Sequence, residues 1–225
     1  MVGNGQSVCR CTFGVGLSGR NNDKVAELIL SEITQEDYFI LSDKTDKVFA
    51  PPLFKHIYLE KDNGHPFYTG AHLSSSFRRS ERYLSPRGVG RIEDYKVQTG
   101  TLVVYKSGPR DGMLGQTFLV DKSLNQGCLS DHVIRIQIED EMLRFWVFAF
   151  LKSKPGLRVL HNIATGSAIL FITPNRIGDL PIPTPTIEQL HENHKTISEY
   201  IDLFGKAHEL ETAAIAQVEA WIKAW

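Results

Sequence analysis

Residues 187–225 read IEQLHENHKTISEYIDLFGKAHELETAAIAQVEAWIKAW. Apolar positions in this stretch recur at alternating steps of three and four residues when His194, His208 and Glu211 are counted at their places. This is the pattern of a coiled-coil seam. Thr186 and Gln189 are spaced as in a capping box, which predicts that a helix starts at this point. The apolar members of the seam are Ile187, Leu190, Ile197, Ile201, Phe204, Ile215, Val218, Ile222 and Trp225.

A helix over this whole stretch would be about 58 Å long, at a rise of about 1.5 Å per residue. A domain built from the other residues would be about 30–40 Å across. We therefore expect the helix to project beyond its own domain and to pair with a second helix along the seam. The alternative is an amphipathic helix that folds back on the core of its own domain.

The distribution of charge is more informative than its total. The chain has 225 residues and a formal net charge of −1, which does not indicate a nucleic-acid partner. Residues 78–110, however, hold eight basic and three acidic side chains, whereas residues 187–225 hold three basic and seven acidic ones. Three cysteines, no secretory leader and no apolar run long enough for a membrane span predict a protein of the reducing cytoplasm.

Three parts are expected along the chain. Residues 1–39 form a glycine-rich leader and a short helix, residues 40–185 form a recognition domain, and residues 186–225 form the long helix. The segment Gly14–Gly19 matches the G-x-G-x-x-G fingerprint of dinucleotide sites. Because no buried strand precedes it and no βα units follow, we interpret it as part of the leader.

Short apolar runs separated by turn residues dominate the middle of the chain. This pattern predicts an α+β fold: a mixed, β-rich domain with short helices, followed by one long helix that forms a coiled coil. Within the domain, residues 142–151 are predicted to be an apolar helix and residues 167–173 a strand. The proline-rich residues 180–185 are predicted to be a rigid, extended hinge before the long helix.

Three stretches carry a resemblance to a known family. They are His65–Leu73 (HPFYTGAHL), Val97–Ile136, with its SGPRDG loop and return strand, and Phe150–Gln189, with the segment ATGSAILFITPNRIGDLPIP. In this order and followed by a long helix, they resemble the target-recognition half of the specificity subunit of type I restriction-modification enzymes (the HsdS family). The likeness covers roughly residues 40–225 and is absent from residues 1–39.

The resemblance implies a DNA-binding subunit. A full specificity subunit has two recognition domains and two antiparallel helices that act as a spacer, whereas this chain has one of each and looks like a half-subunit. The resemblance therefore implies binding to double-stranded DNA and to a methyltransferase subunit, and in a full system to a restriction subunit. It also implies that two copies, or this chain and a second specificity half, pair through their helices.

Two basic segments are the main candidates for contacting DNA, since arginine and lysine bind phosphates or guanine, and serine hydroxyls bind phosphates or bases. The first follows the opening strand at residues 74–91; its alternative is a solvated, charged turn. The second is the glycine-containing loop 106–112, with a plain hairpin loop as its alternative. His132 and Asn175–Arg176 are further candidates, which could instead stabilise loops or cap a helix. The predicted DNA-binding residues are Ser74, Ser75, Ser76, Arg78, Arg79, Arg82, Arg87, Arg91, Lys106, Ser107, Arg110, His132, Asn175 and Arg176.

No catalytic residue, metal site or cofactor is predicted. The chain has no Asn-Pro-Pro-Tyr segment for base methylation, no Walker A lysine loop and no histidine pair at metal-binding spacing. Two alternatives remain open. One is the recognition domain of a single-chain restriction-methyltransferase or phage-defence methyltransferase. The other is a coiled-coil protein-interaction module that does not bind DNA.

Overall fold

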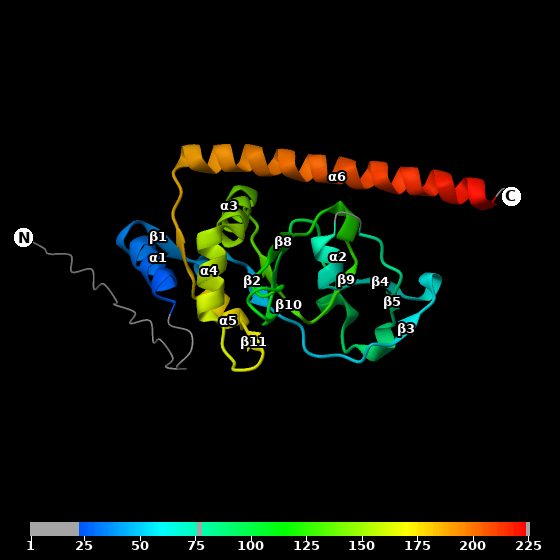
Figure 1. Cartoon of the computed structure of the whole chain (residues 1–225), viewed down its shortest axis with the longest axis horizontal. Coiled ribbons are helices and arrows are strands. Elements are labelled where there is room, and N and C mark those ends of the chain that lie inside the picture. The colour runs from blue at the N-terminus through cyan, green and yellow to red at the C-terminus, as the bar shows by residue number, and fades with distance from the viewer. Residues whose placement is uncertain (1–22, 76–77, 224–225) are drawn as a thin grey trace, which may run out of the picture.

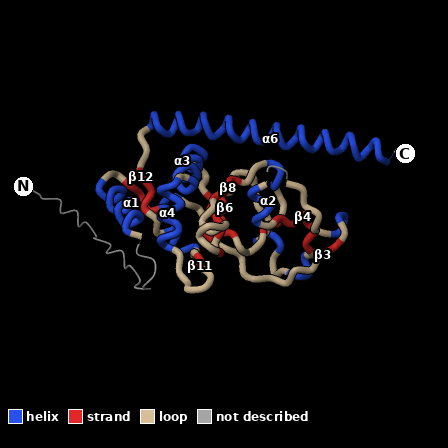
Figure 2. The backbone as a smooth tube through the Cα atoms, in the orientation of Figure 1, coloured by secondary structure: helices blue, strands red, loops and turns tan. Residues whose placement is uncertain are grey.

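The computed structural model of the chain describes residues 23–75 and 78–223 (Figure 1). The glycine-rich leader, Ser76 and Trp225 lie outside these residues. Helices and strands follow one another without a simple repeat, and long loops connect the short strands (Figure 2). The helices are α1 (Lys24–Gln35), α2 (Gly70–Ser74), α3 (Glu141–Lys152), α4 (Lys154–Ile163), α5 (Pro174–Gly178) and α6 (Ile187–Lys223). The strands are β1 (Tyr38–Ile40), β2 (Lys47–Phe49), β3 (Tyr58–Leu59), β4 (His65–Tyr68), β5 (Tyr83–Leu84), β6 (Leu102–Tyr105), β7 (Ser107–Gly108), β8 (Thr117–Leu119), β9 (Cys128–Leu129), β10 (Val133–Gln137), β11 (Leu170–Phe171) and β12 (Pro181–Pro183).

Two four-stranded sheets form the body of the domain. The first has the order β2-β10-β6-β8 and is antiparallel throughout, whereas the second has the order β3-β5-β4-β9, with β4 and β9 parallel. Alternate residues of β6 point to opposite faces of the first sheet. Leu102 and Val104 belong to a core shared with α3 and α4, and Val103 belongs to a second core near the other sheet. The first sheet is therefore buried on both faces, which explains its continuous apolar strands.

Several helix and strand predictions are confirmed, and one segment is corrected. The apolar helix predicted at residues 142–151 is α3, and the predicted strand at 167–173 is present as the shorter β11. The proline-rich segment predicted to be a hinge contains a strand instead: β12 pairs with β1, with Ile182 opposite Phe39. Proline is tolerated in a two-stranded edge pairing like this one, where its missing N–H costs little.

The long helix lies along the domain for most of its length, and only its C-terminal end extends past β3 (Figure 1). Figure 1 shows α6 lying along the domain, above α3 and past α2 towards the end that carries β3. Ile197 and Ile201 pack against the main core. The ring of Phe145 stacks on His194 at 5.3 Å, and that of Phe148 on Tyr200 at 6.5 Å. Because the domain contains two sheets side by side, most of the helix lies beside it, and the expectation of a projecting rod holds only for the C-terminal end.

The two halves of α6 contact the domain differently. The proximal half packs directly on α3, whereas an open cleft of about 500 Å³ separates the distal half from the second sheet. An ion pair of 2.9 Å between Arg79 and Glu219 crosses this cleft. The capping box predicted for the start of α6 is confirmed, since the Gln189 backbone N–H donates to the Thr186 hydroxyl and the Thr186 N–H to the Gln189 side chain.

A buried arginine connects the two sheets. Arg135 on β10 is completely buried, and its guanidinium donates hydrogen bonds to the carbonyl oxygens of Val133 (3.0 Å), Leu129 (2.9 Å) and Tyr95 (3.3 Å). Burial lowers the pKa of Arg135 to about 10, which still leaves the side chain charged at neutral pH. Because Leu129 belongs to β9, these bonds fix the second sheet to the first.

Replacing Arg135 with methionine should therefore destabilise the fold strongly. Three buried carbonyl oxygens would each lose a hydrogen bond from the guanidinium, and among the described residues only that of Tyr95 would keep a second donor, the Leu129 N–H; this is expected to lower the free energy of unfolding by about 3–5 kcal/mol. Urea unfolding followed by circular dichroism measures this loss. Arg87→Met is the matched control, because Arg87 is exposed and its loss should change the stability by less than about 0.5 kcal/mol. Equal stabilities of the two variants would contradict the role given to Arg135.

Candidate nucleic-acid interface

The segment that follows β6 is held in place from both sides. The Lys106 backbone N–H donates to the carbonyl of His132 at 2.9 Å, and the Lys106 carbonyl accepts from the N–H of Ile172 at 2.7 Å. Immediately afterwards, β7 pairs antiparallel with β11, with Ser107 opposite Phe171 and Gly108 opposite Leu170. The loop predicted to contact DNA is thus fixed in position by backbone hydrogen bonds before it turns at Pro109–Gly112.

A group of polar and aromatic side chains gathers at this point. The hydroxyl of Ser107 lies 3.2 Å from Nδ1 of His132, and the ring of His132 stacks on Tyr105 with centroids 6.3 Å apart and planes 18° apart. Residues paired across antiparallel strands share a face, so Phe171 lies on the same face as Ser107. We call Tyr105, Ser107, His132 and Phe171 the recognition group. The sequence prediction included Ser107 and His132 of this group.

Two cations border the recognition group. Arg110 is exposed at the turn after β7, and its guanidinium donates to the carbonyl of His161 at 3.5 Å. The ammonium of Lys106 lies 3.9 Å from a carboxylate oxygen of Asp131, and this carboxylate is almost fully buried. That oxygen accepts no hydrogen bond from the described residues, so Lys106 supplies its nearest positive charge. Lys106 thus compensates a buried charge at the base of the loop, and Arg110 presents a charge at its surface.

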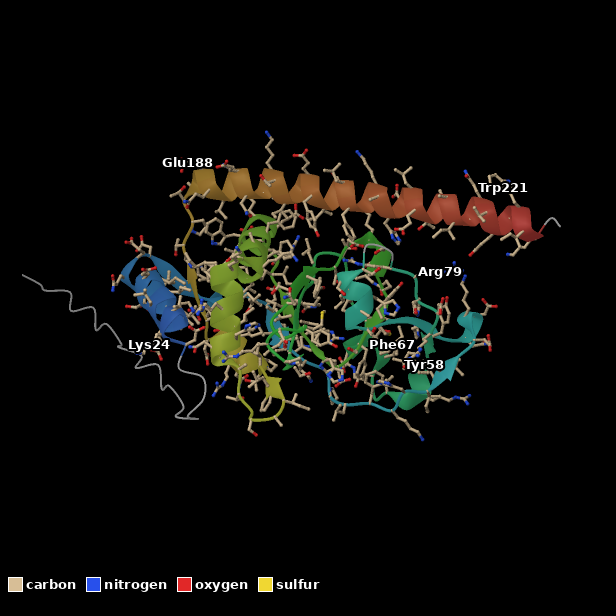
Figure 3. All side chains as sticks on the ribbon, viewed as in Figure 1. Lys24, Tyr58, Phe67, Arg79, Glu188 and Trp221 are labelled. Carbon is tan, nitrogen blue, oxygen red and sulfur yellow. The ribbon has the colours of Figure 1, made fainter. Side chains whose placement is uncertain are left out.

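Arg78 and Arg79 lie on the other side of the domain, where they contact α6. Arg78 is buried, forms an ion pair with Asp121, and places its guanidinium 4.7 Å from the ring centre of Phe204. Figure 3 shows Arg79 on the side facing α6, where it pairs with Glu219. The prediction that Arg78 contacts DNA is incompatible with this burial. The sequence shows the cluster of basic residues. It does not show that α6, which begins more than a hundred residues later, contacts two of these residues.

The remaining candidates do not join the recognition group. The hydroxyl of Ser74 is bonded to carbonyl oxygens within its own helix α2, and the next residue, Ser75, is half-buried. Arg82 lies over the ring of Tyr58, and Arg87 and Arg91 are exposed on loops beside the second sheet. Ser76 lies outside the described residues.

The two candidates on α5, Asn175 and Arg176, lie in different environments. Asn175 is exposed, whereas the guanidinium of Arg176 donates to the carbonyl of Ile163 at 2.8 Å. Arg176 therefore caps the C-terminal end of α4 through the carbonyl of its last residue. This is the helix-capping alternative that the sequence left open for Asn175 and Arg176. Tyr105 and Phe171 were not singled out from the sequence. Their strands pair across long separations, and no local spacing places them beside Ser107.

The chemistry of the recognition group suits a polar, anionic ligand with aromatic or apolar faces. A hydroxyl and an imidazole offer donors and acceptors, two rings offer flat apolar surfaces, and Arg110 offers a planar cation for phosphate or guanine. No set of three His, Cys, Asp or Glu side chains within residues 23–75 and 78–223 is arranged to hold a metal ion. In the same part of the chain, no helix combines the length and the hydropathy needed to cross a membrane.

Comparison with protein families gives a match to most of the chain. Residues 47–220 match the type I restriction modification DNA specificity domain. The chain belongs to this family. Its specificity-domain match begins at β2, includes the recognition group and ends within α6. No curated protein sequence matches the chain.

Two solved structures with TM-scores above 0.5 share the fold of this specificity domain at low sequence identity. A structure on the assembly and conformational transition of a type I R-M system matches with a TM-score of 0.54 and 15% identity, covering 89% of this chain and 50% of that one. The type IIG restriction endonuclease BpuSI matches with a TM-score of 0.53 and 10% identity, covering 78% of this chain and 28% of that one. The HsdS subunit from Thermoanaerobacter tengcongensis matches with a TM-score of 0.49 and 15% identity, covering 82% of this chain and 46% of that one. The chain thus spans half or less of the length of these proteins.

Proposed function

We propose that the chain binds double-stranded DNA sequence-specifically, as the specificity subunit or half-subunit of a type I restriction-modification system. In this role it directs a methyltransferase subunit and a restriction subunit to their target in the cytoplasm, and it performs no catalytic step itself. The observation that carries the proposal is the recognition group with Arg110 beside it, in a chain of the DNA-specificity family. Phosphate contacts position such a reader, and side chains that reach base edges give it specificity.

The distribution of charge favours one side of the domain for DNA. Helix α6 carries an excess of acidic side chains and would repel the phosphate backbone. In Figure 1, α6 and β11 lie on opposite sides of the molecule, and the recognition group is built around the β7–β11 pairing. A duplex approaching from the β11 side would meet the surface around the β7–β11 pairing and would keep its distance from the acidic helix.

We propose further that α6 pairs with the helix of a second copy or of another specificity half. The residues of the predicted seam that lie between Leu190 and Ile215 face the chain's own domain, so a different stripe is available. With about 100° per residue, Leu203, Leu210 and Trp221 fall almost opposite Ile197 and Ile201. These three are 58%, 72% and 63% exposed. They are separated by Ala207, Ala214 and Val218, again at steps of three and four residues.

A paired assembly would read a divided site. Two copies related by a twofold axis place identical recognition groups at the two ends of paired helices, so the target would be two inverted half-sites separated by a gap of fixed length. The paired helices would set that gap. Pairing with a different specificity half would give two unlike half-sites with the same kind of spacing.

A second candidate is the recognition domain of a single-chain restriction-methyltransferase, because the chain also shares its fold with part of the type IIG endonuclease BpuSI. DNA binding is common to both candidates. A coiled-coil interaction module that does not bind DNA is the candidate of another class.

Salt-dependent binding to duplex DNA separates the two DNA-binding candidates from the interaction module. We expect the chain to bind duplex DNA, with the logarithm of its affinity falling linearly with the logarithm of the salt concentration, by about 0.9 per phosphate contacted. Fluorescence anisotropy with a labelled duplex measures this slope. Failure to bind any duplex at low salt would support the interaction module instead.

A further inference from the structure

A short hairpin that ends at Phe171 of the recognition group exposes apolar side chains. Thr165 and Phe171 are joined by two backbone hydrogen bonds, of 2.8 and 2.7 Å, and enclose the turn between them. Ile169 in this turn is 69% exposed, and Phe171 is 44% exposed. We call residues 165–171 the hairpin.

The hairpin has a defined conformation. Gly166 has φ +118°, and a Cβ atom at this position would lie 2.2 Å from the carbonyl oxygen of Ile169. Only glycine can adopt this conformation and allow so close an approach. On the other side of the hairpin, the N–H of Ile172 donates to the Lys106 carbonyl at 2.7 Å. The two exposed apolar side chains are therefore held at a fixed place relative to the basic loop.

The surroundings indicate what would cover these side chains. Single exposed apolar residues are ordinary on a protein surface. Here, however, Phe171 lies directly across from Ser107, whose hydroxyl contacts His132, and the same loop carries Arg110. An apolar tip beside hydrogen-bonding groups and a cation is complementary to a nucleic acid, which combines apolar base faces, polar base edges and charged phosphates. Isoleucine and phenylalanine are among the side chains that wedge between base pairs in DNA-bending proteins.

We propose that the hairpin inserts Ile169, supported by Phe171, between neighbouring base pairs of the bound duplex. This inference rests on the proposed function, and it adds a component that hydrogen bonds do not supply. Insertion unstacks one base step, and pyrimidine–purine steps such as TA and CA unstack most readily. The hairpin therefore contributes specificity for a deformable step next to the bases that the recognition group reads.

Fluorescence of 2-aminopurine tests the insertion, because this base analogue brightens when it is unstacked. The wild-type chain first selects its target from a pool of random duplexes, and 2-aminopurine is then placed at successive positions of that duplex. We expect binding to increase the fluorescence at one step. Ile169→Ser should abolish this increase and weaken binding about tenfold, without changing the slope of affinity against salt, because no phosphate contact is lost.

Leu53→Ser is the matched control, since Leu53 is 84% exposed on the connection between β2 and β3 and belongs to neither the recognition group nor the hairpin. It should leave both the fluorescence and the affinity unchanged, and Phe171→Ala should reduce the increase as Ile169→Ser does. Normal affinity and fluorescence in Ile169→Ser, or no brightening at any position with the wild-type chain, would overturn the insertion while leaving DNA binding intact. If Ile169→Ser kept its DNA binding but no longer retained the methyltransferase subunit, the hairpin would be a protein-docking element. A wild-type chain that selected no duplex would contradict the proposed function itself.

Discussion

Replacing Leu203 and Leu210 with aspartate should convert paired chains into monomers without unfolding them. Both leucines are exposed in the single chain, so the substitutions remove no contact within the domain. In a pair, each buried leucine contributes about 1.5–3 kcal/mol, and each chain supplies two. The dissociation constant of the dimer is therefore expected to rise at least about 1000-fold. Sedimentation equilibrium over a range of concentrations measures this change.

Ile201→Asp with Phe204→Asp is the matched comparison on the opposite face of the same helix. Ile201 packs on the main core, and Phe204 lies against the guanidinium of Arg78. We expect this double variant to lose about 2–4 kcal/mol of folding stability, because charged groups would replace apolar contacts within the chain. If it dissociated the dimer at unchanged stability, and Leu203→Asp with Leu210→Asp had no effect, the seam predicted from the sequence would be the pairing surface after all.

Replacing Lys106 and Arg110 with glutamine should weaken duplex binding about 10- to 100-fold at physiological salt. The loss of the Arg110 phosphate contact is expected to reduce the slope of affinity against salt by about one, and the loss of the Lys106 charge, which Asp131 partly neutralises, to add less than this. Glutamine at position 106 retains a donor near Asp131, which limits the disturbance of that buried carboxylate. Anisotropy titrations at several salt concentrations give both quantities.

The control for the Lys106 and Arg110 double variant removes the same net charge from α6. Lys195 and Lys206 are exposed on α6, away from the recognition group, and their replacement by glutamine also removes two positive charges. This control should leave the slope almost unchanged. Similar losses in the two double variants would mean that total charge, and not the loop after β7, governs the binding.

Local patterns in the sequence predicted the fold where local rules decide it. The capping box at Thr186 and the apolar run of α3 were recognised from residues close together in the chain. The periodicity of α6 also predicted a helix correctly. It did not show which side of the helix faces the domain, because two apolar stripes share the helix and the choice between them depends on the size of the domain alongside.

The part of the candidate site that was predicted from the sequence is also the part formed by residues close together in the chain. Lys106, Ser107 and Arg110 form one loop and were recognised together, but Tyr105 and Phe171 are brought to it by strand pairings across the chain. Arg78 illustrates the opposite failure. An arginine in a basic cluster suggests an exposed ligand-binding residue, and only the tertiary structure reveals that Asp121 and Phe204 surround it.

The central measurement is the affinity of the wild-type chain for two duplexes of equal length and composition. One contains the target selected from a random pool, and the other contains the same bases in shuffled order. Sequence-specific recognition predicts that the selected duplex binds at least about 1000-fold more tightly at physiological salt. Equal affinities for the two duplexes would show that the domain does not read sequence, and would contradict its proposed role as a specificity subunit.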